Sequence, residues 1–228
     1  MKCYYICYHK LIDYQEVWKD NMKKIISIAL MLALVLSFTA CGSKEKDQPT
    51  SQTVSQTETA EQTDAQTDKN GKKVLIVYFS WSGNTHTVAE YIHNTAGGTM
   101  ARIIPENDYA SDYDTVVDVA KQEKKDNVRP KFKDLGVNPE EYDVIFIGYP
   151  IWWYTLPMIM YTFFDTYDLS GKTIIPFNTH EGSDDSGTYK TIQELEPNAT
   201  VLDGLAIRGN EVSTAEEQVK EWLSGLKY

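Results

Sequence analysis

The sequence predicts an α/β fold with a doubly wound parallel sheet, confined to residues 71–228. Three observations lead to this prediction. Apolar, β-branched runs such as 74–79 lack polar alternation, which is typical of strands buried on both faces. Helical patterns separate five such strands, so the sheet should be parallel and covered on both faces. Polar loops directly follow several strands, where ligands bind in a sheet of this kind.

The strands are expected in chain order at 74–79, 100–104, 144–147, 173–177 and 201–207. Pro176 weakens the fourth of these predictions, because proline has no N–H to donate to a neighbouring strand. Helices are indicated between them by apolar positions at helical spacing: Thr85, Val88, Ala89, Ile92 and Ala96; Tyr113, Val116, Val117 and Ala120; and the run 156–164.

The last helix carries the clearest local signal. Ser213 and Glu216 form an S-x-x-E pattern, which predicts a capping box at the start of the helix. The apolar positions that follow keep helical spacing, and they are Ala215, Val219, Trp222, Leu223 and Leu226.

The first seventy residues read as targeting and linking segments. Residues 22–40 combine a basic start with an apolar run, which predicts a secretory signal peptide. The ending at Cys41 resembles the lipobox of bacterial lipoproteins, whose cysteine is lipidated, although Phe38 departs from that pattern. A retained single-span anchor is the alternative. Residues 1–21 have no place before a signal peptide, so we interpret them as an extension from a start codon assigned too early.

Residues 42–70 predict a disordered tether. They include six Thr, five Gln and three Ser, and no aromatic residue. Such a segment cannot bury enough apolar surface to offset its ordering entropy. All three cysteines, Cys3, Cys7 and Cys41, precede it, so the folded part has no disulfide, thiolate metal site or cysteine nucleophile. The localisation expected from these segments is extracytoplasmic, with a lipid anchor as the only link to the membrane.

Composition excludes two classes of protein. The formal net charge is −11, whereas a nucleic-acid binder presents a basic surface to phosphates. Five Trp, fifteen Tyr and seven Phe supply enough core material to exclude disorder throughout the chain.

The loop after the first strand has the composition of an anion site. Three hydroxyls, a glycine and an asparagine stand directly before a helix, where backbone N–H groups and the helix dipole favour a phosphate. The loop contains no Lys or Arg, so compensation is expected from dipoles and hydrogen bonds alone. Ordinary capping of the helix is the alternative. The residues of this loop are Ser80, Trp81, Ser82, Gly83, Asn84 and Thr85.

This loop resembles the phosphate-binding loop of flavodoxins, and the resemblance extends over 71–228. It implies bound FMN and a five-stranded flavodoxin-like sheet of order 2-1-3-4-5. It also implies that two further loops contact the flavin, with buried aromatic core or a mobile acidic loop as their respective alternatives. These loops are Pro150, Ile151, Trp152, Trp153 and Tyr154 after one strand, and Thr179, His180, Glu181 and Gly182 after the next.

The expected function is that of an FMN-binding electron-transfer flavoprotein, with a redox partner protein or a small quinone-like acceptor. An FMN-dependent NAD(P)H:quinone-type oxidoreductase and a flavin-free binding module of the same fold are the alternatives. No catalytic residue is assigned, because a loop histidine such as His180 is more often a polar contact, and no metal site is expected. Glu181, Asp184 and Asp185, with no nearby Lys or Arg, predict a low reduction potential.

Overall fold

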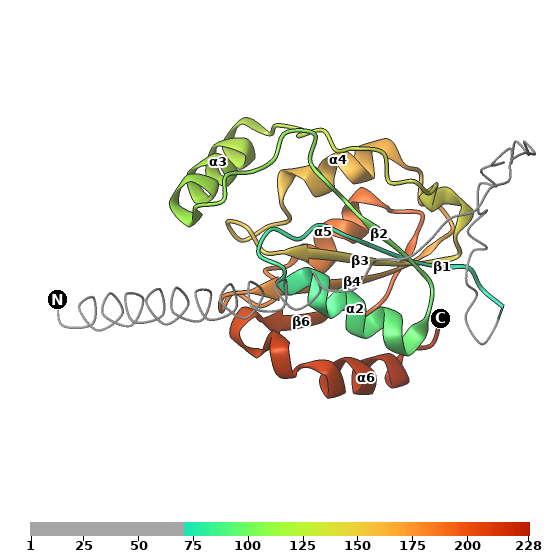
Figure 1. The fold of residues 1–228 in the computed structure, drawn as a ribbon. Coiled ribbons are helices and arrows are strands. Elements are labelled where there is room, and N and C mark those ends of the chain that lie inside the picture. The colour runs from blue at the N-terminus through green and yellow to red at the C-terminus, as the bar shows by residue number, and fades with distance from the viewer. Residues whose placement is uncertain (1–70) are drawn as a thin grey trace, which may run out of the picture. The chain divides into compact units, whose positions relative to one another are not determined.

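The computed structural model describes residues 71–228 (Figure 1). The predictions for 1–21, 22–40, Cys41 and 42–70 lie outside these residues. Within 71–228, no helix is both long enough and apolar enough to span a membrane.

The sheet is parallel and has the predicted order. Neighbouring strands follow β2-β1-β3-β4-β5, and a further short strand, β6, also pairs with β4. The central strands are buried along almost their whole length, as their apolar runs predicted. The strands are β1 Val74–Tyr78, β2 Thr99–Arg102, β3 Val144–Pro150, β4 Thr173–His180, β5 Thr200–Val201 and β6 Leu205–Arg208.

The strand expected at 201–207 is interrupted, and Pro176 explains where. The Ile174 carbonyl accepts a 2.9 Å hydrogen bond from Leu202 N, so Ile174 faces β5 and, two residues on, Pro176 faces the same side. Pro176 has no N–H to offer there, and the chain leaves β4 until Leu205 pairs with Phe177. The single-strand prediction was therefore wrong, and β5 and β6 share the edge.

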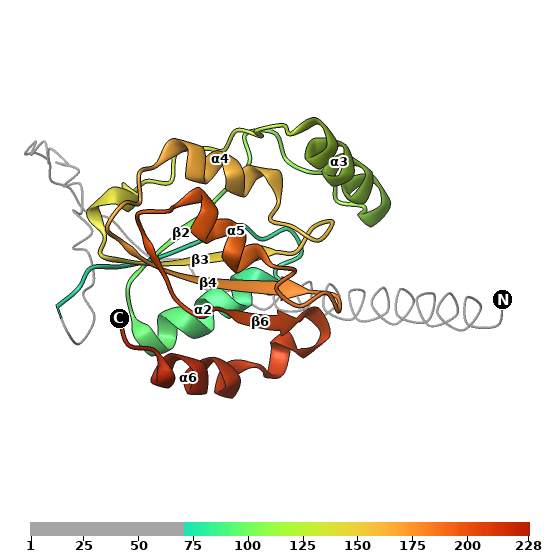
Figure 2. The same ribbon diagram turned by 180° about the vertical axis from the view of Figure 1, so that it is seen from behind.

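Helices cover both faces of the sheet (Figures 1 and 2). One layer contains α2 Asn84–Ala96 and α6 Glu216–Gly225, and the other contains α4 Met158–Thr166 and α5 Thr188–Leu195. The helix α3 Tyr113–Asp126 stands off from the second layer near the carboxyl ends of the strands. Two 3₁₀ segments, η1 Pro139–Glu141 and η2 Gly209–Thr214, complete the elements.

Alternating side chains of the strands feed two apolar cores. On β1, Leu75 and Val77 pack toward α4 and α5, whereas Val74 and Ile76 pack toward α2 and α6. All four side chains are fully buried. Burying an aliphatic side chain of this size stabilises a fold by about 1.5–3 kcal/mol. The two cores thus fix the strands whose ends carry the loops of interest.

The capping box predicted for the last helix was wrong. The helix α6 begins at Glu216 with Ala215 as its N-cap, and no side chain caps it. Ser213 belongs instead to η2, which leads directly into the helix. The 3₁₀ segment replaces the extended residue that a side-chain cap requires.

Candidate functional site

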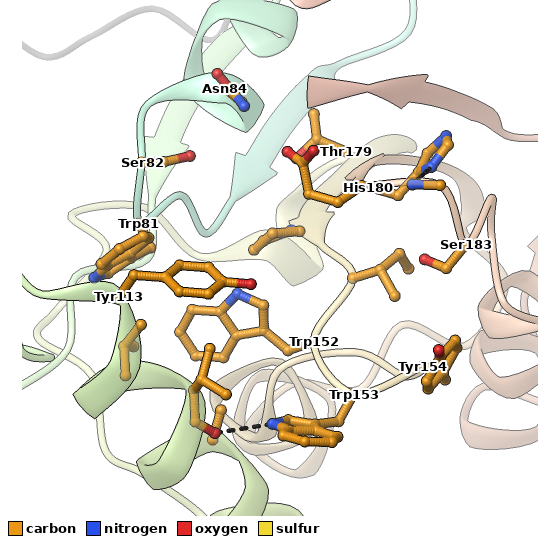
Figure 3. A pocket seen from close by; sticks show the side chains of 17 residues that line it. Trp81, Ser82, Asn84, Tyr113, Trp152, Trp153, Tyr154, Thr179, His180 and Ser183 are labelled. Atoms are coloured by element: carbon orange, nitrogen blue, oxygen red, sulfur yellow. Dashed lines mark hydrogen bonds between the residues drawn. The ribbon is translucent and has the colours of Figure 1, made fainter. Parts of the chain in front are cut away.

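A cleft of about 920 Å³ opens at the carboxyl ends of the strands (Figure 3). It has two sides, which we call the strand-end wall, formed by loops 80–85 and 179–183, and the α3 wall, formed by α3 with loop 150–155. Twelve of the fifteen predicted binding residues line it: Trp81, Ser82, Asn84, Pro150, Ile151, Trp152, Trp153, Tyr154, Thr179, His180, Glu181 and Gly182. The other three, Ser80, Gly83 and Thr85, belong to the first loop but do not line the cleft.

The first loop leaves the start of α2 ready for an anion. Gly83 is the N-cap residue at φ 99°, a conformation that favours glycine. Gly83 has no side chain to cap α2, and the first turn of the helix holds no acidic residue. Backbone N–H groups at such a terminus favour a phosphate or carboxylate. The predicted anion loop therefore has the required geometry.

Two hydroxyls of the first loop are used within the protein. Thr85 Oγ1 lies 2.9 Å from Thr179 Oγ1 in a buried hydrogen bond that joins the first loop to the third. Ser80 Oγ accepts a 3.2 Å hydrogen bond from the N–H of His86. These bonds fix the loop and leave Ser82 and Asn84 to line the cleft.

A cation lies behind this loop, where the sequence had suggested none. Arg102, on β2, donates a 2.8 Å hydrogen bond from Nη2 to the carbonyl oxygen of Ser80. The neighbouring Tyr78 hydroxyl lies 2.7 Å from His86 Nδ1, and burial raises the pKa of this phenol. Arg102 does not line the cleft, so compensation of an anion by dipoles and hydrogen bonds alone stays a prediction.

The second loop makes a tight turn in an unusual conformation. Trp152 and Thr155 exchange two backbone hydrogen bonds of 3.0 and 3.1 Å. Between them, Trp153 and Tyr154 have φ values of 49° and 59°. Asn-Gly is the usual pair in a turn with two positive φ values. Left-handed residues with bulky side chains cost about 1–3 kcal/mol each and cluster at functional sites.

Trp152 and Trp153 occupy different environments. Trp152 packs edge-on against Phe79 and Tyr109, at ring-centroid distances of 5.3 and 5.1 Å, so one side of it belongs to the core. Trp153 instead reaches α3, and its indole N–H donates a 2.9 Å hydrogen bond to the Val117 carbonyl. Both residues still line the cleft (Figure 3).

Two lysines of α3 contact Trp153. Lys124 Nζ donates a 2.6 Å hydrogen bond to the Trp153 carbonyl, and Lys121 Nζ lies 4.9 Å from the centre of its ring. The expectation of no nearby Lys or Arg was therefore wrong for the aromatic loop. The sequence hid this contact because α3 lies about thirty residues before Trp153.

The third loop is folded around His180. Its Nδ1 accepts hydrogen bonds from the N–H groups of Gly182, at 2.9 Å, and Asp184, at 3.2 Å. His180 thus orders the loop through one ring nitrogen while lining the cleft. Asp184 and Asp185 are not among the residues that line the cleft. Asp185 Oδ2 accepts from the N–H of Gly187 instead, which places its charge at the start of α5.

A buried polar network supports the third loop. Asn178, fully buried on β4, donates to the Asp184 carbonyl at 3.2 Å and accepts from the Tyr189 hydroxyl at 2.6 Å. The Tyr149 hydroxyl lies 2.9 Å from Thr188 Oγ1. Burial raises the pKa of both tyrosines, so they remain neutral hydrogen-bonding groups.

Five residues of the cleft were missed by sequence reasoning. They are Ser183 and four residues of α3, namely Tyr113, Val116, Val117 and Ala120. The signal for the four was present, because they form the apolar stripe that predicted the helix. The stripe alone could not show that part of it faces a cleft instead of the core.

The arrangement suits a flat ring joined to an anionic group. Asn84 and Ser82 lie at one end of the cleft, and Trp152, Trp153 and Tyr154 lie at the other (Figure 3). Ligand pockets of 300–1,000 Å³ with aromatic walls and a few polar groups are typical of cofactor sites. Within 71–228, no three His, Cys, Asp or Glu side chains are grouped so that they could hold a metal ion.

The Flavodoxin family model matches residues 73–226, which is most of the chain. The chain belongs to the flavodoxin family. No curated protein matches the sequence.

Solved structures agree with this family membership. A protein of Bacteroides uniformis named as a flavoprotein is 32% identical, with a TM-score of 0.60, over 67% of this chain and 98% of that one. A protein of Bacteroides eggerthii with the same designation is 32% identical, with a TM-score of 0.59, over 68% and 99%. A Lactobacillus acidophilus flavoprotein solved in complex with FMN is 25% identical, with a TM-score of 0.50, over 63% and 97%.

These comparisons confirm the predicted flavodoxin-like fold with strand order 2-1-3-4-5. Family membership and the FMN complex of the Lactobacillus protein support FMN as the cofactor.

Proposed function

We propose that this flavodoxin is an FMN-binding electron-transfer protein. The observation that carries the proposal is one cleft that joins an open helix N-terminus to a cluster of aromatic side chains. Ser82, Asn84 and the first N–H groups of α2 would hold the phosphate. Trp152 and Trp153 would pack beside the flavin ring, and loop 179–183 would offer backbone groups to its polar edge.

FMN supplies one- and two-electron redox chemistry when bound, and the protein sets its binding, access and potential. Buried hydrogen bonds hold the strand-end wall in place before any ligand arrives. Preorganisation of this kind lowers the ordering cost of binding.

Partners and location form the rest of the proposal. The signal-like segment ending at Cys41 supports a lipid-anchored domain outside the cytoplasm. There the domain would exchange electrons with a partner protein. Its net negative charge argues against nucleic acid as a partner.

A second candidate function is direct reduction of a small quinone-like acceptor, with NAD(P)H as the electron source. Tyr113 and Tyr154 line the cleft although 66% and 73% of their surfaces are exposed. Exposed aromatic side chains at a cleft are favourable contacts for a planar organic molecule.

The absorption spectrum of the purified protein tests the cofactor. We expect the visible absorption bands of an oxidised flavin, and release of FMN on denaturation, identified by its mass. A colourless protein that does not take up added FMN would instead indicate a flavin-free binding module. Steady-state oxidation of NAD(P)H with a quinone distinguishes the two redox functions, because an electron carrier alone turns over slowly in this assay.

A further inference from the structure

We infer that Lys121 and Lys124, held against the cleft by Trp153, raise the reduction potential of the bound flavin. The inference rests on the proposed function, because it concerns the FMN that the cleft would bind. It means that α3, which lies outside the three loops after β1, β3 and β4, helps to set the reduction potential.

Three contacts join α3 to the aromatic loop. The Trp153 indole N–H donates to the Val117 carbonyl at 2.9 Å, and Lys124 Nζ donates to the Trp153 carbonyl at 2.6 Å. Lys121 Nζ lies over the same ring at 4.9 Å from its centre. Both ammonium groups thus contact Trp153, which itself lines the cleft.

Besides Trp153, α3 is held by a hydrogen bond from Tyr109 to Glu123 and by the ring contact between Trp81 and Tyr113, and little of it is buried. Only Val116 and Ala120 of its fourteen residues are buried, whereas the nine residues of α4 include five buried ones. At its far end, Arg129 forms an ion pair with Asp165 of α4 and lies over the ring of Tyr161. Trp153 is therefore one of the few contacts that hold the cleft side of α3 in place.

The backbone of loop 150–155 is consistent with a role of Trp153 in holding α3. Trp153 and Tyr154 both keep positive φ values that bulky residues rarely adopt. Strain of this kind persists where surrounding contacts impose it. The hydrogen bonds to Val117 and from Lys124 are contacts of that kind.

The redox consequence follows from charge balance. Uptake of two electrons and one proton leaves the flavin ring system with one negative charge, which nearby cations stabilise. The acidic residues of loop 179–187 lie farther from the aromatic loop, whereas α3 itself also carries Asp114 and Asp118. Asp184 and Asp185 do not line the cleft, and Glu181 lies near Gly209 and Asn84, at the opposite end from the aromatic loop.

The test is potentiometry of the full chain reconstituted with FMN, reduced by dithionite in the presence of reference dyes. The double variant Lys121→Met/Lys124→Met should bind oxidised FMN within about twofold of the wild type. Its ratio of reduced to oxidised flavin at a fixed potential should fall about tenfold, or about 30 mV for a two-electron couple. Trp153→Phe keeps an aromatic side chain but loses the indole N–H donor. It should give a smaller fall in the same direction.

The matched control is Lys125→Met/Lys131→Met. It changes the net charge equally, and both lysines are exposed and make no hydrogen bond or ring contact with Trp153. A fall below twofold in the control supports the inference. An equal fall in the control, or an unchanged or raised potential in the test variant, overturns it. A wild-type chain that binds no FMN would overturn the proposed function instead, and the spectrum shows this before any potential is measured.

Discussion

The strand-end wall of the cleft rests on buried hydrogen bonds between side chains, whereas the α3 wall rests on contacts at the protein surface. Thr85 and Thr179 pair inside the first wall, on residues that the cores already hold in place. In the second wall, Trp153 and two exposed lysines provide the link. The comparison indicates that the strand-end wall is held more firmly than the α3 wall.

The largest effect is expected from Thr179→Val. The substitution leaves the buried Thr85 hydroxyl without its partner, which costs about 1–3 kcal/mol of unfolding free energy. Affinity for FMN should fall as well, because the start of α2 loses its link to loop 179–183. Chemical denaturation and FMN titration measure the two effects.

Thr85→Val and the double variant complete a cycle for this pair. If the two hydroxyls stabilise one another, the double variant should be less destabilised than the sum of the single variants. Additive losses would show that the hydrogen bond between Thr85 and Thr179 does not stabilise the strand-end wall.

A smaller effect on global stability is expected from Trp153→Phe. One hydrogen bond near the surface contributes about 0.5–1.5 kcal/mol. Its loss should instead appear locally, as faster amide hydrogen exchange in α3 with unchanged exchange in α2. Exchange that quickens equally in both helices would contradict a separately held α3 wall.

Neutralising the acidic loop should change the potential less than neutralising the lysines. Asp184→Asn/Asp185→Asn keeps an acceptor for the N–H of Gly187 and removes two charges outside the cleft. A solvated charge about 10 Å away contributes about 0.4 kcal/mol, so the potential should rise only slightly. A rise larger than the fall in the lysine double variant would show that these acids, and not the lysines, dominate the potential.

The smallest expected effect is a pH dependence of the unfolding free energy, caused by Glu123 of α3. Burial raises the pKa of Glu123, although a hydrogen bond from Tyr109 opposes the shift. A carboxyl with a raised folded-state pKa stabilises the fold at low pH, and this contribution is lost as pH rises through that pKa. Unfolding free energy relative to Glu123→Gln should therefore fall as pH rises from about 4.5 toward neutrality. A difference that is constant over this range, in denaturation at several pH values, would contradict the assignment.

Much of the strand-end wall could be predicted from the sequence, because its information is local. Apolar runs such as 74–79 mark strands, and hydroxyls and glycines directly after them mark the loops. The resemblance to flavodoxins then singled out Thr179 and His180, and both line the cleft.

Loop 150–154 of the α3 wall was also predicted, but the part that α3 plays in this wall was not, because it depends on contacts between distant segments. Trp153 meets Val117 and Lys124 only in the folded chain, and Arg102 reaches the first loop only through the sheet. Propensity also misleads at Trp153 and Tyr154, since neither residue type favours positive φ.

The interruption of the edge strand at Pro176 has a consequence for solubility. Within 71–228, the two edges of the sheet present only β2, β5 and β6, none longer than four residues. Exposed edges of long, regular strands can pair with another molecule and begin aggregation. A proline on β4 shortens the edge formed by its neighbours, and the domain should resist edge-to-edge association at high concentration.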